Sequence, residues 1–258
     1  MPYADLHVHT TRSDGALELT EVPGVARRAG VDVVALTDHD RLQPFDEPAI
    51  ERDGVRIVHG IELRVETDAG QRVDLLGYGI EPTADLEATT ERIQRNRIER
   101  GRAIVDRVED RLDVDLGVTV DDGFGRPHVA RAIDTHPETE YDYEGAFDHL
   151  IGNDGPCFVS RELPSFEHGR QVLGEAGRLV SLAHPFRYPD PEAALELTSE
   201  LDAVERYYPY GRAVDSNRVD RAIERYGLLA TGGTDAHERD LGVNGLSKAE
   251  YRKLGLES

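Results

Sequence analysis

The chain has 258 residues, which is enough for one large domain or two small ones with a substantial core. Its single cysteine, Cys157, excludes an intramolecular disulfide framework and a zinc finger. The polar amino terminus and the lack of an 18-residue apolar run argue against a signal peptide and a membrane span. We therefore expect a cytoplasmic protein.

Acidic residues outnumber basic ones by 51 to 30, which gives a formal net charge of −21. Such a surface repels a polyanion over most of its area, so a phosphate-bearing substrate must be met locally. Only Lys248 and Lys253 among the basic residues are lysines. An excess of carboxylates with almost no lysine suits high salt, where charges are strongly screened. The composition favours a halophilic source, with an ordinary acidic mesophilic protein as the alternative.

Short β-rich runs alternate with helical stretches in the first third of the chain, which is typical of an α/β fold with a parallel sheet. A helix is expected at 19–29, where Gly30 ends it. Strands are expected at 3–9, 31–37, 56–65 and 72–78. From 85 to about 112 the apolar spacing is closer to that of a helix, and the many Glu and Arg residues indicate a largely solvated helix or helix pair.

Short irregular pieces are expected next, as far as about residue 161, and the alternation then resumes. Helices are expected at 167–176, 192–200 and 215–226, and strands at 178–184, 201–207 and 228–235. This pattern predicts a barrel-like core made of residues 1–82 and 162–258. A mostly helical insertion at 83–161 interrupts it.

The first expected strand ends in Asp5-Leu6-His7-Val8-His9. Because side chains alternate faces along a strand, the carboxylate and the two imidazoles point the same way. This arrangement suits a metal ion, whereas in a plain core each of these buried polar groups would need its own partner. Asp14 follows in a loop, where Gly15 permits a turn that aims this carboxylate back.

Four further strands also finish in His, Asp or Glu. They end at Thr37-Asp38-His39-Asp40, Gly60-Ile61-Glu62, Leu182-Ala183-His184-Pro185 and Gly232-Gly233-Thr234-Asp235-Ala236-His237. In α/β barrels the carboxyl ends of the strands carry the chemistry. Taken alone, a histidine such as His59 is more often a satisfied or surface side chain, and Asp38 and Asp40 can equally orient His39 or cap the next element.

The joint set is harder to explain as structure alone. It comprises His7, His9, Asp14, His39, Glu62, His184, Asp235 and His237. These potential ligands exceed the roughly four to six that one ion uses. The set therefore predicts two or three clustered metal ions.

In chain order, these motifs resemble those of the PHP family, named for polymerase and histidinol phosphatase, and the resemblance spans nearly the whole chain. It rests on the runs Asp5 to Gly15, Thr37 to Asp40, Gly60 to Glu62, Ala183 to Pro185 and Gly233 to His237. The resemblance implies an α/β fold of the distorted (β/α)7 barrel type, here with a mostly helical insertion. It also implies a two- or three-metal site and the cleavage of phosphate esters.

The resemblance assigns metal-ligand roles to the joint set above and makes Glu62 the bridge between two ions. One position departs from the pattern. Relatives in the nucleotide-directed branch have a histidine before a Leu-Gly or Leu-Gly-Tyr run, and here Asp74 stands in Val73-Asp74-Leu75-Leu76-Gly77-Tyr78. Aspartate is an acceptable ligand for hard metals but holds zinc-like ions less selectively. The implied cofactors are two or three divalent ions of Mn, Zn, Fe or Mg, with Asp74 as a ligand of the third.

The insertion is similar to that of the small-chain nucleotide and oligoribonucleotide phosphoesterases of this family. The similarity lies in Arg95-Asn96-Arg97, Arg100, Arg102 and Gly125-Arg126-Pro127-His128-Val129-Ala130-Arg131. A guanidinium can donate two parallel hydrogen bonds to a phosphate group. A helix that begins near Pro127 would also direct the N–H groups of its amino terminus at an anion. We therefore predict Arg126 and His128 as catalytic phosphate contacts. Most of the arginines in 95–102 can instead pair with Glu91 and Glu99 on a solvated helix.

The resemblance implies hydrolysis through metal-activated water, with His128 or another water as the acid for the leaving group. The favoured substrate is a nucleotide phosphomonoester, such as a nucleoside 3′,5′-bisphosphate, or the 5′ end of a short RNA. No Gly-x-Ser-x-Gly elbow or reactive-cysteine signature supports a protein nucleophile. We expect a small phosphorylated partner and no membrane, and the oligomeric state stays open.

The sequence leaves three alternatives open. One is histidinol phosphate phosphatase, and the second is a non-catalytic PHP module. The third is an amidohydrolase-like metal barrel that acts on C–N bonds, which the Ser13-Asp14-Gly15 and Gly60-Ile61-Glu62 motifs fit poorly.

Overall fold

The computed structural model describes residues 1–121 and 124–257. The chain divides into two compact units. The first combines Met1–Thr90 with Leu163–Ser258, and the second is Glu91–Glu162. Each unit has its own buried apolar core.

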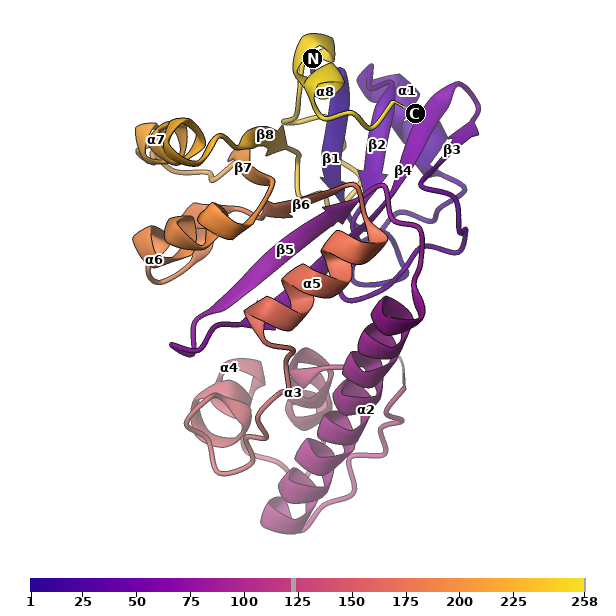
Figure 1. Ribbon diagram of the computed structural model, residues 1–258. Helices are drawn as coiled ribbons and strands as arrows, with labels where there is room; N and C mark the ends of the chain where they lie inside the picture. Colours follow the sequence, from indigo (N-terminus) through magenta and orange to yellow (C-terminus); the bar gives the residue numbers. More distant parts are fainter. Residues whose placement is uncertain (122–123, 258) are drawn as a thin grey trace. The chain divides into compact units, whose positions relative to one another are not determined.

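The first unit is built on one mixed sheet (Figure 1). Its strands are β1 (Ala4–Val8), β2 (Val33–Leu36), β3 (Ala49–Arg52), β4 (Val55–Glu66), β5 (Arg72–Tyr78), β6 (Leu179–Leu182), β7 (Ala203–Tyr207) and β8 (Leu229–Gly232). They lie in the order β1-β2-β4-β5-β6-β7-β8, with β3 paired on β4. β5 is antiparallel to both neighbours, and the other pairs along this path are parallel. The carboxyl ends of β1, β2, β6, β7 and β8 therefore share one edge.

The sheet curls back on itself where the segment after β8 meets β1. The backbone N–H of His9 donates to the carbonyl of Ala236 at 3.0 Å, and the N–H of Ala236 donates to the carbonyl of His7 at 3.1 Å. Gly233 allows this approach, because a Cβ there would stand 2.4 Å from the Cβ of His7. Closure by an isolated bridge instead of a full ladder makes the barrel distorted, and the expected α/β fold is confirmed.

Helices surround this sheet. They are α1 (Val22–Ala29), α5 (Phe166–Ala176), α6 (Pro191–Glu196), α7 (Asn217–Tyr226) and α8 (Lys248–Lys253), with short 3-10 turns at η2 (Pro185–Arg187) and η3 (Leu197–Glu200). Gly30 ends α1 in a left-handed conformation, as expected from the sequence. The short strand β3 and helix α8 were not predicted, because each is too short to show a clear period.

The second unit is helical. The long helix α2 (Ala84–Leu112) begins in the first unit and continues into the second, followed by α3 (Arg126–Thr135), α4 (Tyr143–Ala146) and the π-helical turn η1 (Phe147–Ile151). The helix expected to begin near Pro127 is α3, whereas α4 and η1 lie where only irregular pieces were expected. Their apolar faces form a cluster around Val108, Val129, Ile133 and Leu150. Within residues 1–121 and 124–257, no helix has both the length and the apolar character needed to cross a bilayer.

Candidate metal centre

The predicted ligands at the carboxyl edge of the sheet meet in three overlapping groups. Within each group the potential ligand atoms lie within 4.8 Å of one another. The outer group is His9, Asp14, His39 and His237, the central group is His7, His9, Glu62 and Asp235, and the third group is Glu62, Asp74 and His184. His9 joins the first two groups and Glu62 joins the last two. The whole predicted set therefore forms one continuous row.

Strand β1 supplies His7, and His9 follows directly after it, whereas Asp5 of the same strand has a different task. The carboxylate of Asp5 accepts hydrogen bonds from Thr234 Oγ1 at 2.6 Å and from the backbone N–H groups of Thr234 and Gly242 at 2.9 and 2.8 Å. Burial raises the pKa of Asp5 to about 6 despite these bonds. Asp5 thus fastens the loop after β8 and lies outside the three groups.

Several positions of the site hold unusual backbone conformations. His184 has φ 23°, Asp235 has φ 54° and Asp40 has φ 52°. A positive φ is sterically costly for a residue with a side chain, about 1–3 kcal/mol, and such residues cluster at functional sites. Here it turns the side chains that follow β6 and β8 toward the row.

Glu62 is the electrostatic centre of the row. Its Oε2 lies 3.0 Å from Nδ1 of His39 and 3.3 Å from Nε2 of both His7 and His9, and its Oε1 lies 2.9 Å from Nε2 of His184. Burial alone would raise the pKa of Glu62, but the imidazoles of His39 and His7 outweigh it and hold the pKa well below its usual range. A carboxylate placed between two groups in this way has the position that a bridging ligand requires.

His7 is held from behind by Glu205, a buried residue of β7 that the sequence analysis missed. Glu205 Oε1 lies 3.0 Å from Nδ1 of His7, and Oε2 accepts the backbone N–H of His184 at 2.7 Å. Burial lowers the pKa of His7, yet Glu205 and Glu62 together raise it well above its usual value. A carboxylate behind a ligating histidine fixes the ring and leaves its other nitrogen free for the metal. One sequence feature could have indicated Glu205, because this carboxylate follows the apolar residues Ala203 and Val204 in an expected strand.

The buried atoms of the row fit a divalent cation. His7 Nε2, His9 Nδ1 and Glu62 Oε2 are buried without a hydrogen-bond partner. Leaving a buried polar atom unsatisfied costs about 1–3 kcal/mol, so three together call for a ligand. Imidazole and carboxylate donors are those that zinc, manganese and iron accept.

The outer group is the part of the row that reaches solvent. The side chains of Asp14, His237 and His39 are 56%, 36% and 20% exposed, whereas His7, His9 and Glu62 are fully buried. Asp38 shapes the loop that carries Asp14, because its carboxylate accepts hydrogen bonds from Thr10 N at 2.8 Å and from Ser13 Oγ at 2.7 Å. Asp38 therefore orients the loop that carries Asp14, and its hydrogen bonds go to Thr10, Ser13 and Gln43 instead of to His39.

The third group differs because an arginine already binds both carboxylate oxygens of its aspartate. Arg64 Nε and Nη2 donate to the two carboxylate oxygens of Asp74 at 2.6 and 2.7 Å. Asp74 still lies 3.8 Å from Nε2 of His184. The metal-ligand role of Asp74 remains a prediction.

Arg126 and His128 lie in the second unit, at the start of α3. Arg126 Nη1 donates to the carbonyl of Ile151 at 3.2 Å and to Asn153 Oδ1 at 3.0 Å, and its guanidinium lies 5.8 Å from the ring centres of Phe147 and Phe158. Nδ1 of His128 accepts the backbone N–H of Gly125 at 3.1 Å. Both side chains thus have local partners that hold the start of α3. Their contact with phosphate remains a prediction.

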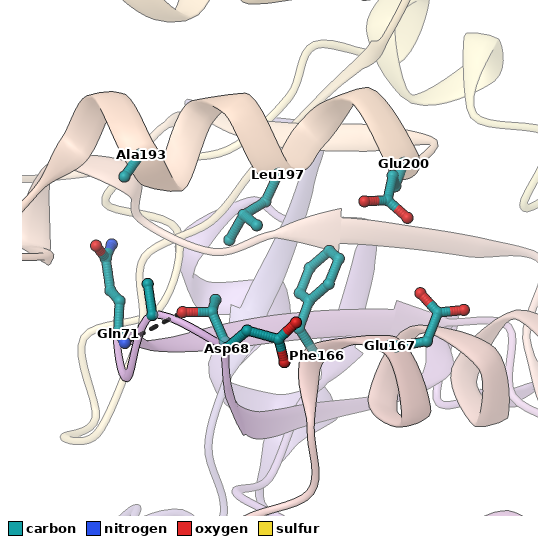
Figure 2. A pocket seen from close by; sticks show the side chains of 9 residues that line it. Asp68, Gln71, Phe166, Glu167, Ala193, Leu197 and Glu200 are labelled. Atoms are coloured by element: carbon teal, nitrogen blue, oxygen red, sulfur yellow. Dashed lines mark hydrogen bonds between the residues drawn. The ribbon is translucent and has the colours of Figure 1, made fainter.

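A separate cavity of about 330 Å³ lies between the β4–β5 turn, the start of α5 and the α6–η3 segment (Figure 2). It contains no histidine, and its walls include Phe166, Leu197, Glu167 and Glu200. Arg170 lies 2.7 Å from Glu167 and 3.6 Å from Glu200, which compensates both charges. This cavity lacks the chemistry of the histidine and carboxylate row.

Comparison with known proteins supports the family that the motifs suggested. The family model described as the PHP domain matches residues 5–152, which is more than half of the chain. Two solved structures share the fold over nearly all of both chains. One is described as a metal-dependent phosphoesterase from Bifidobacterium adolescentis (TM-score 0.74, 22% identity, 97% and 94% covered). The other is described as an amidohydrolase from Chromobacterium violaceum (TM-score 0.72, 24% identity, 98% and 96% covered).

Curated relatives are also similar over most of the chain. A phosphoribosyl 1,2-cyclic phosphate 1,2-diphosphodiesterase from Eggerthella lenta is 30% identical over 248 residues, which covers 90% of this chain and 93% of the relative. A 3′,5′-nucleoside bisphosphate phosphatase from Chromobacterium violaceum is 28% identical, with 92% and 88% covered. A 5′-3′ exoribonuclease from Haemophilus influenzae is 29% identical, with 71% and 69% covered. The chain belongs to the PHP domain family of phosphoesterases.

Proposed function

We propose that this protein is a metal-dependent hydrolase of phosphate esters on a phosphorylated ribose, with a nucleoside 3′,5′-bisphosphate as the favoured substrate. The observation that carries the proposal is the row of ligand groups joined through His9 and Glu62. Two or three divalent ions are proposed for it, because adjacent groups share a ligand and each offers three or four donors.

Divalent ions at such a site would stabilise the charge on the phosphoryl oxygens and lower the pKa of water. The protein itself provides orientation. Glu205 holds His7, and Arg187 and Tyr208 hold Asp235 through hydrogen bonds of 2.8 Å each to Oδ2. The exposed side of Asp14, His39 and His237 is the side by which a phosphate would enter.

Arg126 and His128 are proposed as contacts to the substrate phosphate, with His128 as one candidate for the leaving-group acid. A guanidinium suits this role because its fork matches two phosphate oxygens. Removal of the Arg126 side chain should raise KM for the phosphate ester, and removal of the His128 side chain should also lower kcat if it supplies the leaving-group proton.

A second candidate substrate is a phosphoribosyl 1,2-cyclic phosphate, because the relative with that activity is 30% identical over nearly the whole chain. The 5′ end of a short RNA is a further candidate from the exoribonuclease relatives. These substrates share a phosphate ester on ribose.

Phosphate release by the full-length protein tests the proposal. The protein is assayed in high salt with manganese or zinc against a nucleoside 3′,5′-bisphosphate, a phosphoribosyl 1,2-cyclic phosphate, a 5′-phosphorylated RNA and histidinol phosphate. The cyclic substrate is followed by ring opening, and the RNA by release of nucleoside monophosphates. We expect turnover of the bisphosphate that a chelator abolishes and added metal restores. Selective turnover of histidinol phosphate would reverse the choice of substrate, and a metal-loaded protein inert on all four would leave a non-catalytic module.

A further inference from the structure

A second cavity, of about 290 Å³, adjoins the metal centre in the first unit. Its lining comes from η2 and from the chain that follows β7, and consists of Phe186, Arg187, Tyr208, Pro209, Tyr210 and Arg212. Among the described residues no carboxylate lines it, although the chain carries a net charge of −21. The lining of this cavity is therefore positively charged, although the protein as a whole is strongly negative.

The wall of this cavity is shared with the metal centre. Arg187 Nη1 and the hydroxyl of Tyr208 both donate to Asp235 Oδ2 at 2.8 Å. The ring of Tyr208 also meets the ring of His184 edge-on, with the centres 5.4 Å apart. A ligand in the cavity would therefore lie one side chain away from two predicted metal ligands.

The guanidinium groups keep unused hydrogen-bonding capacity. Arg212 makes one hydrogen bond, from Nη2 to the carbonyl of Phe186 at 2.8 Å, and forms no ion pair with a carboxylate in 1–121 or 124–257. Arg187 uses only Nη1, for Asp235 and for Tyr208 Oη at 3.0 Å. Each guanidinium has five N–H donors, so both can also bind an anion.

The aromatic side chains, by contrast, are already engaged. Tyr210 packs against Phe186 and Tyr208, with ring centres 5.4 and 4.6 Å apart. The hydroxyl of Tyr210 accepts the N–H of Phe186 at 3.3 Å, and the hydroxyl of Tyr208 donates to Asp235. The rings support one another as a wall, which favours an anion over a stacked base as the occupant.

We propose that this cavity binds the second phosphate of the substrate, the one that is not cleaved, with Arg212 as the principal contact. The inference rests on the proposed function and adds to it a reason for selecting doubly phosphorylated substrates. It applies equally to a nucleoside 3′,5′-bisphosphate and to a phosphoribosyl cyclic phosphate, since each carries two phosphate groups. Arg212 is a specificity residue in this proposal, and the metal centre performs the hydrolysis.

The test compares adenosine 3′,5′-bisphosphate with adenosine 3′-monophosphate and adenosine 5′-monophosphate on the wild type and on Arg212→Gln. We expect the ratio of kcat/KM for the bisphosphate to that for the better monophosphate to fall about tenfold or more, mainly through KM. The ratio should fall less in Arg212→Lys than in Arg212→Gln, because lysine keeps the positive charge but lacks the paired N–H groups of a guanidinium. Arg225→Gln is the matched control, since Arg225 is an exposed arginine that pairs with Glu196 and does not line this cavity.

Calorimetric titration of the same full-length variants with adenosine 3′,5′-bisphosphate in the presence of EDTA gives a readout independent of turnover. The proposal predicts about tenfold weaker binding for Arg212→Gln than for the wild type. An unchanged kinetic ratio would overturn it. If kcat/KM falls by the same factor for the bisphosphate and the monophosphates, the cavity contacts a part that they share, such as the nucleoside. If the wild type binds the bisphosphate more tightly than Arg212→Gln does but hydrolyses none of the substrates, the proposed hydrolase function is refuted. The proposed phosphate subsite then still stands. Protein that neither binds nor hydrolyses the bisphosphate would refute both.

Discussion

The central and third ligand groups share Glu62 but differ in how their second carboxylate is balanced. In the central group, Asp235 Oδ1 faces the imidazoles of His7 and His9 at 3.4 and 3.1 Å. In the third group, Asp74 is already bound by both arms of Arg64. Arg187 occupies only Oδ2 of Asp235, whereas Arg64 occupies both oxygens of Asp74. A carboxylate bound on both oxygens by a permanently charged arginine offers a cation much less than one whose second oxygen faces imidazoles.

This difference teaches that the number of potential ligands does not by itself give the number of metals. The third group has three suitable side chains within 4.8 Å, yet Arg64 already supplies a positive charge there. In the outer group Asp14 faces His9, His39 and His237, and in the central group Arg187 donates only to Oδ2 of Asp235, so Oδ1 is left to the imidazoles. A histidine gives up its proton to a metal, whereas an arginine does not. We therefore expect the central and outer groups to bind metal more tightly than the third.

The largest expected effect comes from Glu62, which belongs to both compared groups. Glu62→Gln keeps the shape and removes the charge that faces four histidines, so metal binding should weaken at both groups. We expect kcat/KM for the favoured phosphate ester to fall about 10³-fold or more, since bound metal supplies several kcal/mol and each 1.4 kcal/mol is tenfold. Steady-state kinetics and metal analysis by mass spectrometry measure the two losses.

Glu66→Gln on the same strand is the matched control, because Glu66 is partly exposed and pairs with Arg72 outside the ligand groups. It should retain near wild-type kcat/KM and metal content. Normal metal content and activity in Glu62→Gln would show that the charge of Glu62 is not needed for metal binding at the central and third groups.

A smaller effect is expected from Glu205, which acts on the central group through His7. Glu205→Gln still reaches Nδ1 of His7 but cannot hold the ring with a negative charge, so metal affinity should fall about 10- to 100-fold. Competition with a metal-binding dye measures this affinity. If Glu205 only supports the fold, the variant will unfold at lower temperature while its metal affinity stays unchanged, which would argue against a positioning role.

The sequence pattern predicted the ends of β1, β2 and β6 to within two residues because that signal is local, and parallel strands bring such ends to one edge. The strand end expected at Glu62 is wrong, because β4 continues to Glu66 through its ladder with β5, and Glu62 reaches the row from inside that strand. Glu205 was missed because its partner His7 is 198 residues away in the chain, and nothing nearby marks the contact. Long-range pairs of this kind depend on the order of the strands, which no local pattern specifies.

The pairing of Asp74 with Arg64 was missed for a related reason. The two residues stand directly opposite each other in the β4–β5 ladder, and the register of that ladder decides which side chains meet. From the sequence, Asp74 is a carboxylate in a buried strand, and a metal was the natural partner to predict. Only the register reveals that an arginine is available.

Arg64 provides the sharpest test of the difference between the groups. Arg64→Gln leaves the carboxylate of Asp74 without its cation, beside Glu62 and His184, so the third group should then attract a metal. We expect about one additional equivalent of manganese per chain at saturation, with only a modest change in kcat/KM. Arg64→Lys should keep the wild-type stoichiometry because it retains the charge. Equal metal content in all three proteins would mean that Arg64 does not decide occupancy.

The smallest effect concerns a histidine outside the compared groups. His59 is buried, its Nε2 accepts the N–H of Gln43 at 3.0 Å, and its ring packs 5.1 Å from that of Phe45. Burial lowers the pKa of His59 to about 4, whereas Glu62 outweighs burial at His39 and raises the pKa there to about 9. One buried imidazole without a facing carboxylate is therefore neutral in the fold, while another beside Glu62 holds a proton until a cation takes its place.

Since the unfolded chain takes up a proton on His59 near pH 6.5 and the folded chain only near pH 4, the contribution of His59 to stability is complete above pH 6.5. It is lost as the pH falls toward 4. Between pH 7.5 and pH 5 the free energy of unfolding should drop by about 2 kcal/mol more in the wild type than in His59→Gln. Urea unfolding at the two pH values measures the difference, and comparison with the variant cancels every other titrating group. If the free energy of unfolding drops equally in the two proteins, His59 can hold a proton in the folded state. The pKa of His59 would then not be lowered, and His59 and His39 would differ only in their contacts.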